Sequence, residues 1–329
     1  MEERILDSLR DASVLVTGGA GFIGSHLVRR LVGEDADVHV LTSEVSSLYP
    51  GRLLEIKDKI TVHEGNVVDR SAMDSVARRV KPQVIFHMAA FTHVGKSWTR
   101  VDECIQTNVQ GTVSLLQALN DVGYKRFLNF GTSEIYGDIP APFREDAIVN
   151  PISPYAVSKY AAERFCRMFY RSFGWPLVML RPFNAYGPGQ TPDRVIPEII
   201  ARAVRGDELA MTQGLQTREF NYVTDLVDGF VRAAVTPGIE GEVINIGCGE
   251  DVSMRAIATT ILDLMGNPIT PKFGALPERP AEIMEMRCDN TKARALLGWE
   301  PKHTLQEGLA KTIDWYKAEL AGPRSPFNP

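Results

Sequence analysis

Tyr155 and Lys159 are the side chains of this sequence best placed for acid–base chemistry. They are four residues apart in a predicted helix that begins near Pro154, so both lie on one face of it. A tyrosine phenol normally has a pKa of about 10. A neighbouring positive charge favours the phenolate, which could then accept a proton near neutral pH. Thr132, at the end of a predicted strand, could hydrogen-bond the same substrate hydroxyl.

A glycine-rich turn near the N-terminus predicts where a cofactor binds. The apolar run Val14–Thr17 leads into glycines at 18, 21 and 24, and an amphipathic segment follows. In this order of strand, tight turn and helix, the glycines let the main chain approach a pyrophosphate at the helix N-terminus. Without that order, three glycines would indicate only a loop. The turn residues expected to contact a dinucleotide are Gly18, Gly21, Phe22, Ile23 and Gly24.

The end of the second predicted strand, Val38–Leu41, bears on which dinucleotide binds. An Asp or Glu usually stands there and binds the adenosine ribose hydroxyls. Here Thr42 and Ser43 take its place, and Glu44 comes two residues late. A carboxylate would repel a 2′-phosphate, whereas hydroxyls would not, and Arg52 could reach that phosphate. We therefore expect NADP, and NAD is the alternative if Thr42 and Ser43 only begin a loop.

Predicted strands alternate with predicted helices in the first half of the chain. Strands over 60–63, 84–87 and 126–130 are separated by helices over 70–80 and 101–121. This alternation is typical of an α/β fold with a Rossmann-like, doubly wound parallel sheet, whose ligands bind beyond the carboxyl ends of the strands. The residues there that we expect to contact the cofactor are Asn66, Val67, Met88, Ala89 and Ala90. The last of these strands leads into Thr132, Ser133 and Glu134.

The chain changes in composition after Arg181, where RPFNAYGPGQTPDR is rich in proline and glycine. We expect this loop to wrap a ligand and to begin a smaller α/β lobe. A helix over 225–235 and a strand over 242–246 then return to the first domain. The predicted NAD(P)-binding domain comprises residues 1–182 and about 221–250, and the predicted substrate lobe comprises about 183–220 and 251–329.

The composition of the 329 residues, 44% hydrophobic and 23% charged, is that of a globular protein. A net charge of −5 gives no reason to expect nucleic acid or an anionic membrane as a partner. No stretch of about 18 apolar residues predicts a membrane span, and the N-terminal segment lacks a signal-peptide core. The four cysteines show neither metal-ligand nor disulfide spacing, so we expect no metal and a reducing, cytoplasmic location.

Several motifs together resemble the extended short-chain dehydrogenase/reductase family, and more narrowly its nucleotide-sugar epimerases and dehydratases. They are TGGAGFIG, HMAA, Thr132 with the YxxxK of Tyr155 and Lys159, and RPFNAYGP, and the resemblance runs from about residue 12 to 318. It implies a Rossmann domain, a lobe that binds a nucleotide-diphosphate sugar, a tightly held NAD(P), and usually a homodimer. The dimer would pair the helices over 101–121 and 154–173.

The resemblance also implies roles for single residues. Thr132, Tyr155 and Lys159 match the family's hydride-transfer triad, in which Lys159 also holds a ribose of the cofactor. Two departures, Asn66 for an Asp near the adenine and Thr42 for an acidic residue, bear on the choice of cofactor. The residues implied to bind the substrate, some of them its diphosphate, are Thr92, Asn184, Val195, Arg218 and Arg279.

Glu134 is the residue that bears on the reaction. In these enzymes Tyr155 would take a proton from the sugar 4-hydroxyl while a hydride leaves C4 for the nicotinamide, and the ketone then acidifies C5. Glu134 could remove the C5 proton, a step that general bases accelerate by ~10²–10⁴. Loss of water across C5–C6 would give a 4-keto-6-deoxy sugar. Ser133 is too weak an acid to replace the Asp that dTDP-glucose dehydratases carry there.

We therefore expect a nucleotide-sugar 4,6-dehydratase, with Ser133 counted among its catalytic segment. The alternative is a 4-epimerase, although simple 4-epimerases usually carry a small or hydroxyl residue at the position of Glu134. A decarboxylase, which the segment Thr132-Ser133-Glu134 also resembles, and a 4-keto reductase are less favoured. Proteins of this fold that only sense the cofactor typically lack the tyrosine or the lysine, and this sequence has both.

Overall fold

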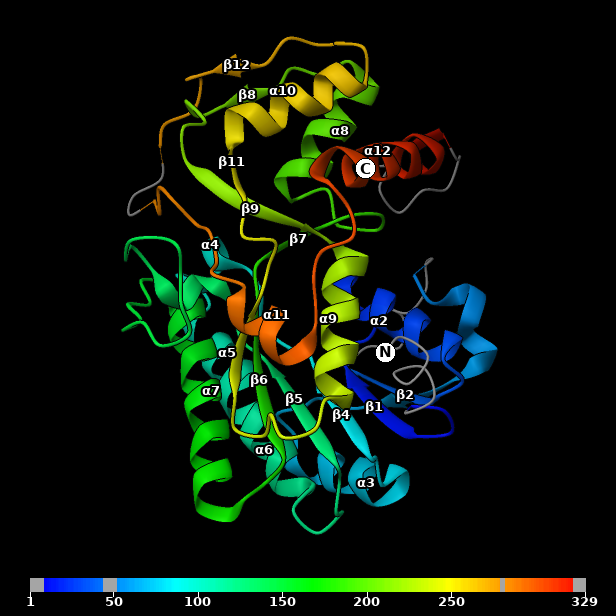
Figure 1. The fold of residues 1–329 in the computed structure, drawn as a ribbon. Helices are drawn as coiled ribbons and strands as arrows, with labels where there is room; N and C mark the ends of the chain where they lie inside the picture. The colour runs from blue at the N-terminus through cyan, green and yellow to red at the C-terminus, as the bar shows by residue number, and fades with distance from the viewer. Residues whose placement is uncertain (1–8, 44–51, 279–281, 322–329) are drawn as a thin grey trace.

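A computed structural model describes residues 9–43, 52–278 and 282–321. They form two lobes, a larger one built on a parallel sheet and a smaller one above it (Figure 1). Glu44, the carboxylate that follows the second predicted strand, and Arg279, an expected substrate contact, lie outside the described residues.

Seven parallel strands form the sheet of the larger lobe, in the order β10-β6-β5-β4-β1-β2-β3. Runs such as SVLVT and VIFH are buried along almost their whole length, as expected for strands covered on both faces. The strands are β1 (Ser13–Thr17), β2 (Asp37–Thr42), β3 (Ile60–Glu64), β4 (Val84–His87), β5 (Arg126–Phe130), β6 (Leu177–Pro182) and β10 (Val243–Ile246). The predicted Rossmann-like α/β fold is confirmed.

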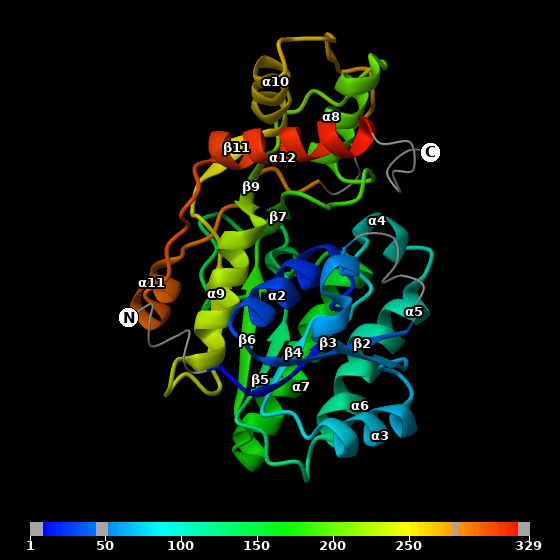
Figure 2. The same cartoon turned by 90° about the vertical axis from the view of Figure 1, so that its right-hand side faces the viewer.

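Helices cover both faces of this sheet, and each face has its own apolar core. One face carries α2 (Phe22–Gly33), α9 (Val223–Val235) and α11 (Thr291–Leu297), and the other carries α3 (Arg70–Val80), α6 (Gly111–Ala118) and α7 (Pro154–Phe173). Figure 2 shows α2 and α9 side by side. Short elements are η2 (Leu54–Lys59), α4 (Val94–Ser97) and η4 (Ser133–Tyr136).

The long helix predicted over 101–121 is interrupted by a wider turn. It consists of α5 (Val101–Ile105), a π-helical turn η3 (Gln106–Gln110) and α6. Asn108 lies in this turn, and its side chain accepts from the N–H of Phe91 (2.8 Å) and donates to the hydroxyl of Ser158 (2.8 Å). The π turn therefore brings the buried amide of Asn108 into contact with the loop after β4 and with α7.

The smaller lobe is built around the three-stranded sheet β11-β9-β7, and its helices pack together in a separate core. Its strands are β7 (Asn184–Tyr186), β9 (Thr217–Tyr222), β11 (Asp251–Ser253) and the pair β8 (Ala210–Met211) and β12 (Lys272–Phe273). Its helices are α8 (Val195–Arg205), α10 (Met254–Leu264) and α12 (Leu305–Ala321).

Residues 291–299 lie against the larger sheet and not in the smaller lobe, to which the sequence analysis assigned them. Trp299 is fully buried there, and its indole N–H donates to the carbonyl of Asp225 on α9 (2.9 Å). Ala293 and Leu297 of α11 belong to the same core. The amphipathic pattern of α11 predicts a helix but does not say which lobe its apolar face meets.

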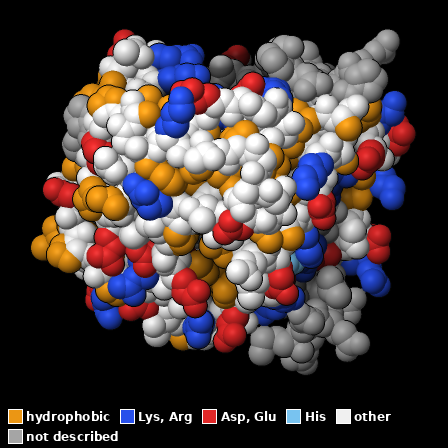
Figure 3. All heavy atoms as spheres, turned by 90° about the horizontal axis from the view of Figure 1, so that it is seen from above, with side chains coloured by type: hydrophobic (Ala, Val, Ile, Leu, Met, Phe, Trp, Pro, Cys, Tyr) orange, Lys and Arg blue, Asp and Glu red, His pale blue; other side chains and the backbone are white. Residues whose placement is uncertain are grey.

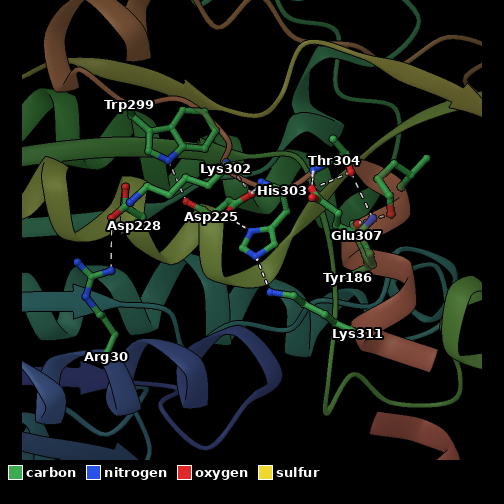
Figure 4. A network of polar contacts seen from close by, with 11 residues as sticks. Arg30, Tyr186, Asp225, Asp228, Trp299, Lys302, His303, Thr304, Glu307 and Lys311 are labelled. Atoms are coloured by element: carbon green, nitrogen blue, oxygen red, sulfur yellow. Dashed lines mark hydrogen bonds and ion pairs between the residues drawn. The ribbon is translucent and has the colours of Figure 1, made fainter. Parts of the chain in front are cut away.

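Asp225 also fixes the segment that leads from Trp299 back into the smaller lobe. Its carboxylate accepts from the backbone N–H groups of Lys302 (3.1 Å) and His303 (2.9 Å) and lies 2.8 Å from Nδ1 of His303. On the other side of the ring, Nε2 lies 3.0 Å from Nζ of Lys311 on α12 (Figure 4). A capping box between Thr304 and Glu307 then starts α12. The two lobes are thereby joined by specific polar contacts.

On the face shown in Figure 3, Lys and Arg side chains are interspersed with Asp and Glu, so no single sign of charge dominates there. Over residues 9–43, 52–278 and 282–321, no helix is long and apolar enough to cross a membrane. Within the same ranges, no cluster of three or more His, Cys, Asp or Glu side chains could hold a metal ion.

Candidate active site

The glycine turn between β1 and α2 has the geometry of a site for a pyrophosphate. Gly18 has φ +71°, and a Cβ on it would lie 2.7 Å from the backbone N of Ala89. A Cβ on Gly24 would lie 2.3 Å from the carbonyl oxygen of Gly18. Gly21 caps α2 without a side-chain hydrogen bond, and the first turn of the helix carries no acidic residue. The positive end of α2 is thus suited to an anion, and the turn fits a dinucleotide.

A buried chain of contacts holds Ala89 against that turn. Thr17 accepts from the N–H of Ala89 (3.0 Å), and its hydroxyl lies 2.9 Å from Nδ1 of His87. Nε2 of His87 lies 2.9 Å from the hydroxyl of Thr112 on α6. Burial, and then the charge of Lys159, lower the pKa of His87 to about 3, so the ring is neutral and serves as a structural bridge. Met88 and Ala90, both half-buried, flank Ala89 at the end of β4.

The residues expected around the adenosine lie after β2 and β3. Thr42 is buried and Ser43 is exposed at the end of β2. Arg52 donates to the carbonyls of Gly189 (3.0 Å) and Ala20 (3.4 Å), so its guanidinium lies beside the glycine turn. Asn66 accepts from the N–H of Val68 (3.0 Å). Its amide therefore shapes the loop, which the sequence alone did not indicate.

Val67 is buried beside that loop, and a Cβ on Gly111 would lie 2.7 Å from its side chain. Phe22 and Ile23, the first residues of α2, are half-buried. All three positions lie at the carboxyl edge of the sheet, where the sequence placed them.

Thr132, Glu134 and Tyr155 come together at the same edge. Thr132 follows β5 and accepts from the N–H of Glu134 (3.3 Å), which starts the turn η4. Tyr155 lies in the first turn of α7, whose cap is Ser153 with Pro154 next to it. Burial raises the pKa of Tyr155 to about 12; a hydrogen bond with Thr132 opposes this rise, and the charge of Glu134 adds to it. The phenol therefore contacts the hydroxyl of Thr132 and is within the electrostatic influence of the Glu134 carboxylate.

The positive charge that lowers the pKa of Tyr155 comes from an unexpected residue. Arg194, just before α8, is the charged group that lowers the pKa of Tyr155, whereas we expected Lys159 to do so. Lys159 is buried one turn further along α7, and burial lowers its own pKa to about 8. Arg194 is the last residue of the segment RPFNAYGPGQTPDR, but the sequence does not indicate that its charge acts on Tyr155, because only the fold brings the two lobes together.

The burial of Lys159 predicts a trade between stability and function. We expect Lys159→Met, which removes the buried charge, to raise the free energy of unfolding at pH 7 by about 1–3 kcal/mol while abolishing turnover. A pKa of about 8 in the folded chain against an ordinary 10.5 means that the unfolded state binds more protons between these values. Wild-type stability should therefore rise with pH across that window, and the gain in Lys159→Met should shrink. Urea unfolding of both proteins at several pH values, without added dinucleotide, measures this; a pH-independent difference would contradict it.

Ser133 and Asn184 both contact Met286, a residue that the sequence analysis did not single out. The buried hydroxyl of Ser133 donates to the Met286 sulfur (3.4 Å). The amide of Asn184 donates to the carbonyl of Glu219 (3.2 Å) and lies 3.7 Å from the same sulfur. The hydroxyl of Ser133 is therefore held by a hydrogen bond to a methionine sulfur. Nothing in the sequence distinguishes Met286 from an ordinary core methionine.

The other residues expected at the substrate are spread over both lobes. Arg218 on β9 forms an ion pair with Glu282 and donates to the carbonyls of Thr217 (2.7 Å) and Ile283 (2.6 Å). Val195 is half-buried at the start of α8, and Thr92 is exposed after β4. In the described part of the chain, no hydrogen bond or ion pair joins Arg218, Val195 or Thr92 to Tyr155.

Comparison with known proteins places this geometry in a family. The family model described as GDP-mannose 4,6 dehydratase matches residues 15–312. A dTDP-glucose 4,6-dehydratase of Shigella flexneri is 33% identical over 338 residues, covering 93% of this chain and 92% of the relative. A UDP-glucose 4-epimerase of Mycolicibacterium smegmatis is 36% identical over 314 residues, covering 92% of this chain and 98% of the relative.

Solved structures agree with these relatives. A UDP-glucose 4-epimerase from Thermotoga maritima with UDP-glucose has a TM-score of 0.87 at 32% identity, covering 93% of this chain and 99% of that one. A dTDP-glucose 4,6-dehydratase from Streptomyces venezuelae with NAD bound has a TM-score of 0.84 at 30% identity, covering 94% and 98%. The chain therefore belongs to the extended short-chain dehydrogenase/reductases, in the GDP-mannose 4,6-dehydratase-like family of nucleotide-sugar dehydratases and epimerases.

Proposed function

We propose that this protein is an NAD(P)-dependent nucleotide-sugar 4,6-dehydratase. The observation that carries the proposal is the carboxylate of Glu134, which lies in the turn directly after Thr132 and acts electrostatically on the Tyr155 phenol. A dehydratase needs two bases near one sugar ring, one at the 4-hydroxyl and one at C5. Tyr155 and Glu134 are two groups of the required kind at one place.

The residues would divide the work as follows. Thr132 orients the 4-hydroxyl, and Tyr155 accepts its proton as the phenolate. Burial raises the pKa of Tyr155, and the positive charges of Lys159 and of a bound oxidised nicotinamide would favour the phenolate against it. A bound nicotinamide dinucleotide would supply the chemistry of taking a hydride from C4 and returning it at C6. Glu134 takes the C5 proton and can deliver a proton to the departing C6 hydroxyl, so water leaves without a further acid. Lys159 would hold the nicotinamide ribose, and the start of α2 would bind the pyrophosphate.

The substrate would be a sugar linked to a nucleoside diphosphate. Relatives of the chain bind such compounds, as the structure with UDP-glucose illustrates. We assign the diphosphate to Asn184, Arg218 and Arg279, and further substrate contacts to Thr92 and Val195. A guanidinium fork is suited to a diphosphate. Arg218 would then have to share its position between the substrate and Glu282.

A 4-epimerase is the second candidate, because epimerases are as similar to this chain as dehydratases are. An epimerase from Methanothermobacter thermautotrophicus has a TM-score of 0.90 at 30% identity, covering 97% of this chain and 96% of that one. An epimerase would rotate the ketone and return the hydride at C4, a cycle that leaves Glu134 without a chemical task.

Mass spectrometry of the products from a panel of UDP-, GDP-, CDP- and dTDP-sugars separates these functions. A dehydratase product is lighter than its substrate by one water, a decarboxylase product is lighter by one carbon dioxide, and an epimerase product has the substrate's mass. We expect the loss of water. A product of unchanged mass from the best substrate would replace the dehydratase by the epimerase.

We also propose that NADP is preferred over NAD. Thr42 and Ser43 leave the end of β2 without a carboxylate within residues 38–43, and Arg52 lies beside the glycine turn. Relatives hold NAD, so the preference would be a feature of this chain. Calorimetric titration of dinucleotide-free protein should give a lower Kd for NADP, and Thr42→Asp should reverse the order by repelling the 2′-phosphate. Tighter binding of NAD by the wild type would overturn the preference.

We infer that a second copy of the chain covers α5 and α7. These helices contact each other and present the exposed apolar side chains of Val101, Ile105, Val157, Phe165 and Met168. Exposed apolar side chains gathered on two helices that pack together often mark an interface. Sedimentation should give a homodimer, and Val157→Lys should weaken it; a wild-type monomer at all concentrations would contradict the assignment.

A further inference from the structure

A buried ion pair lies between the segments that carry the proposed bases. Arg181, at the end of β6, donates from Nε (2.8 Å) and Nη2 (2.7 Å) to the two carboxylate oxygens of Glu163 on α7. The side chains are 2% and 1% exposed. Burying two charges is costly unless their geometry is well fixed, and this two-pronged contact fixes it.

Tyr136 adds a third partner to the pair. Its hydroxyl accepts from Nη1 of Arg181 (2.8 Å) and donates to Oδ1 of Asn245 on β10 (2.7 Å). The ring is fully buried and stacks on Phe143. Burial raises the pKa of Tyr136, so its hydroxyl remains a phenol. Both hydrogen bonds of this hydroxyl are thus fixed in direction.

Two of these three residues, Glu163 and Tyr136, belong to segments that hold the proposed catalytic groups. Glu163 follows Lys159 by one turn of α7 and Tyr155 by two, on the same buried face. Tyr136 ends the four-residue turn η4 that contains Glu134. The pair also lies against the residue before Thr132, because a Cβ on Gly131 would be 3.5 Å from Oε2 of Glu163.

We infer that Tyr136 is a positioning residue that, through Arg181, holds Glu134 at C5 of the sugar while Tyr155 faces the 4-hydroxyl. This role rests on the proposed dehydratase function. Without the Tyr136 hydroxyl, Nη1 of Arg181 keeps, among the described residues, the carbonyl of Glu145 at 3.5 Å as its hydrogen-bond acceptor, and Oδ1 of Asn245 loses this donor. The turn η4 then loses the polar link to α7 that runs through Arg181. A displacement of about 1 Å at a reacting group can lower a rate by 10²-fold.

Tyr136→Phe tests this role, because the ring stays and only the hydroxyl is lost. We expect turnover to fall by about ten- to a hundredfold with KM unchanged, since the loss affects the geometry of reaction and not the binding of substrate. In a single turnover, oxidation at C4 should proceed at the wild-type rate. Deuterium exchange from D₂O into C5 should be slowed by the same factor as turnover. Tyr124→Phe is the matched control, because its buried hydroxyl has no hydrogen-bond partner among the described residues. Arg181→Lys, which keeps the charge but loses the fork, should reproduce the split if Tyr136→Phe does not fold.

The outcomes distinguish this inference from the function on which it rests. If the wild type exchanges deuterium into C5 and Tyr136→Phe exchanges at the same rate, Tyr136 does not position Glu134. A variant that slows C4 oxidation and C5 exchange equally, in step with a loss of thermal stability, also overturns the inference. If the wild type makes product without C5 exchange, the dehydratase proposal itself fails, and the role of Tyr136 fails with it.

Discussion

Glu134→Gln should abolish overall turnover and leave oxidation at C4 intact. Glutamine is nearly isosteric with glutamate and keeps the N–H bond to Thr132, so the turn η4 should not change. It cannot accept a proton from C5, and the loss of a general base lowers a rate by about 10²–10⁴. The variant should therefore stop with a bound 4-keto sugar and reduced nicotinamide, which single-turnover absorbance detects.

Glu300→Gln provides the control for Glu134→Gln, because Glu300 is an exposed residue outside the segments assigned to cofactor and substrate, and its replacement makes the same change in charge. It should behave as the wild type. If Glu134→Gln turns over at the normal rate, Glu134 only lines the site and transfers no proton. That result would favour the epimerase.

Tyr155→Phe should lower turnover by roughly 10³-fold or more and leave the binding of cofactor and substrate nearly intact. The ring would fill the same buried position, but the group that accepts the 4-hydroxyl proton would be gone. Unlike Glu134→Gln, this variant should accumulate no reduced nicotinamide, because the first step is the one that fails.

Tyr124→Phe again serves as the control, since it removes a buried hydroxyl that has no hydrogen-bond partner among the described residues and no part in the proposed chemistry. Calorimetry with the dinucleotide and rapid-mixing kinetics together distinguish a lost base from a lost site. A Tyr155→Phe protein that keeps a tenth of the wild-type rate would remove Tyr155 from this role.

The parts of the molecule that local sequence determines were predictable. The parallel sheet follows from alternating strands and helices, and the turn at Gly18 follows from glycine spacing, since both patterns are set within a few residues. The meeting of Thr132 with Tyr155 follows from the topology, because the carboxyl ends of parallel strands share one edge of the sheet. The family resemblance supplied the roles, which the spacing alone could not.

Features that depend on contacts distant in sequence were not predictable. Arg194, in the other lobe, acts on Tyr155 through its charge, and Met286 accepts a hydrogen bond from Ser133, which is 153 residues away in the sequence. Trp299 packs on the larger sheet, where its indole N–H donates to a backbone carbonyl of α9. No local pattern in the sequence specifies this partner. The same holds for Arg181 and Glu163, whose buried pairing is visible only in the folded chain.

The incorporation of deuterium at C5 tests the central claim most directly. Wild-type protein is given its sugar nucleotide in D₂O, and the product is analysed by mass and by the position of the label. A dehydratase that uses Glu134 at C5 predicts a product lighter by one water that carries solvent deuterium at C5, because the original proton leaves and a solvent proton returns. A product of unchanged mass with no label at C5 would contradict the account.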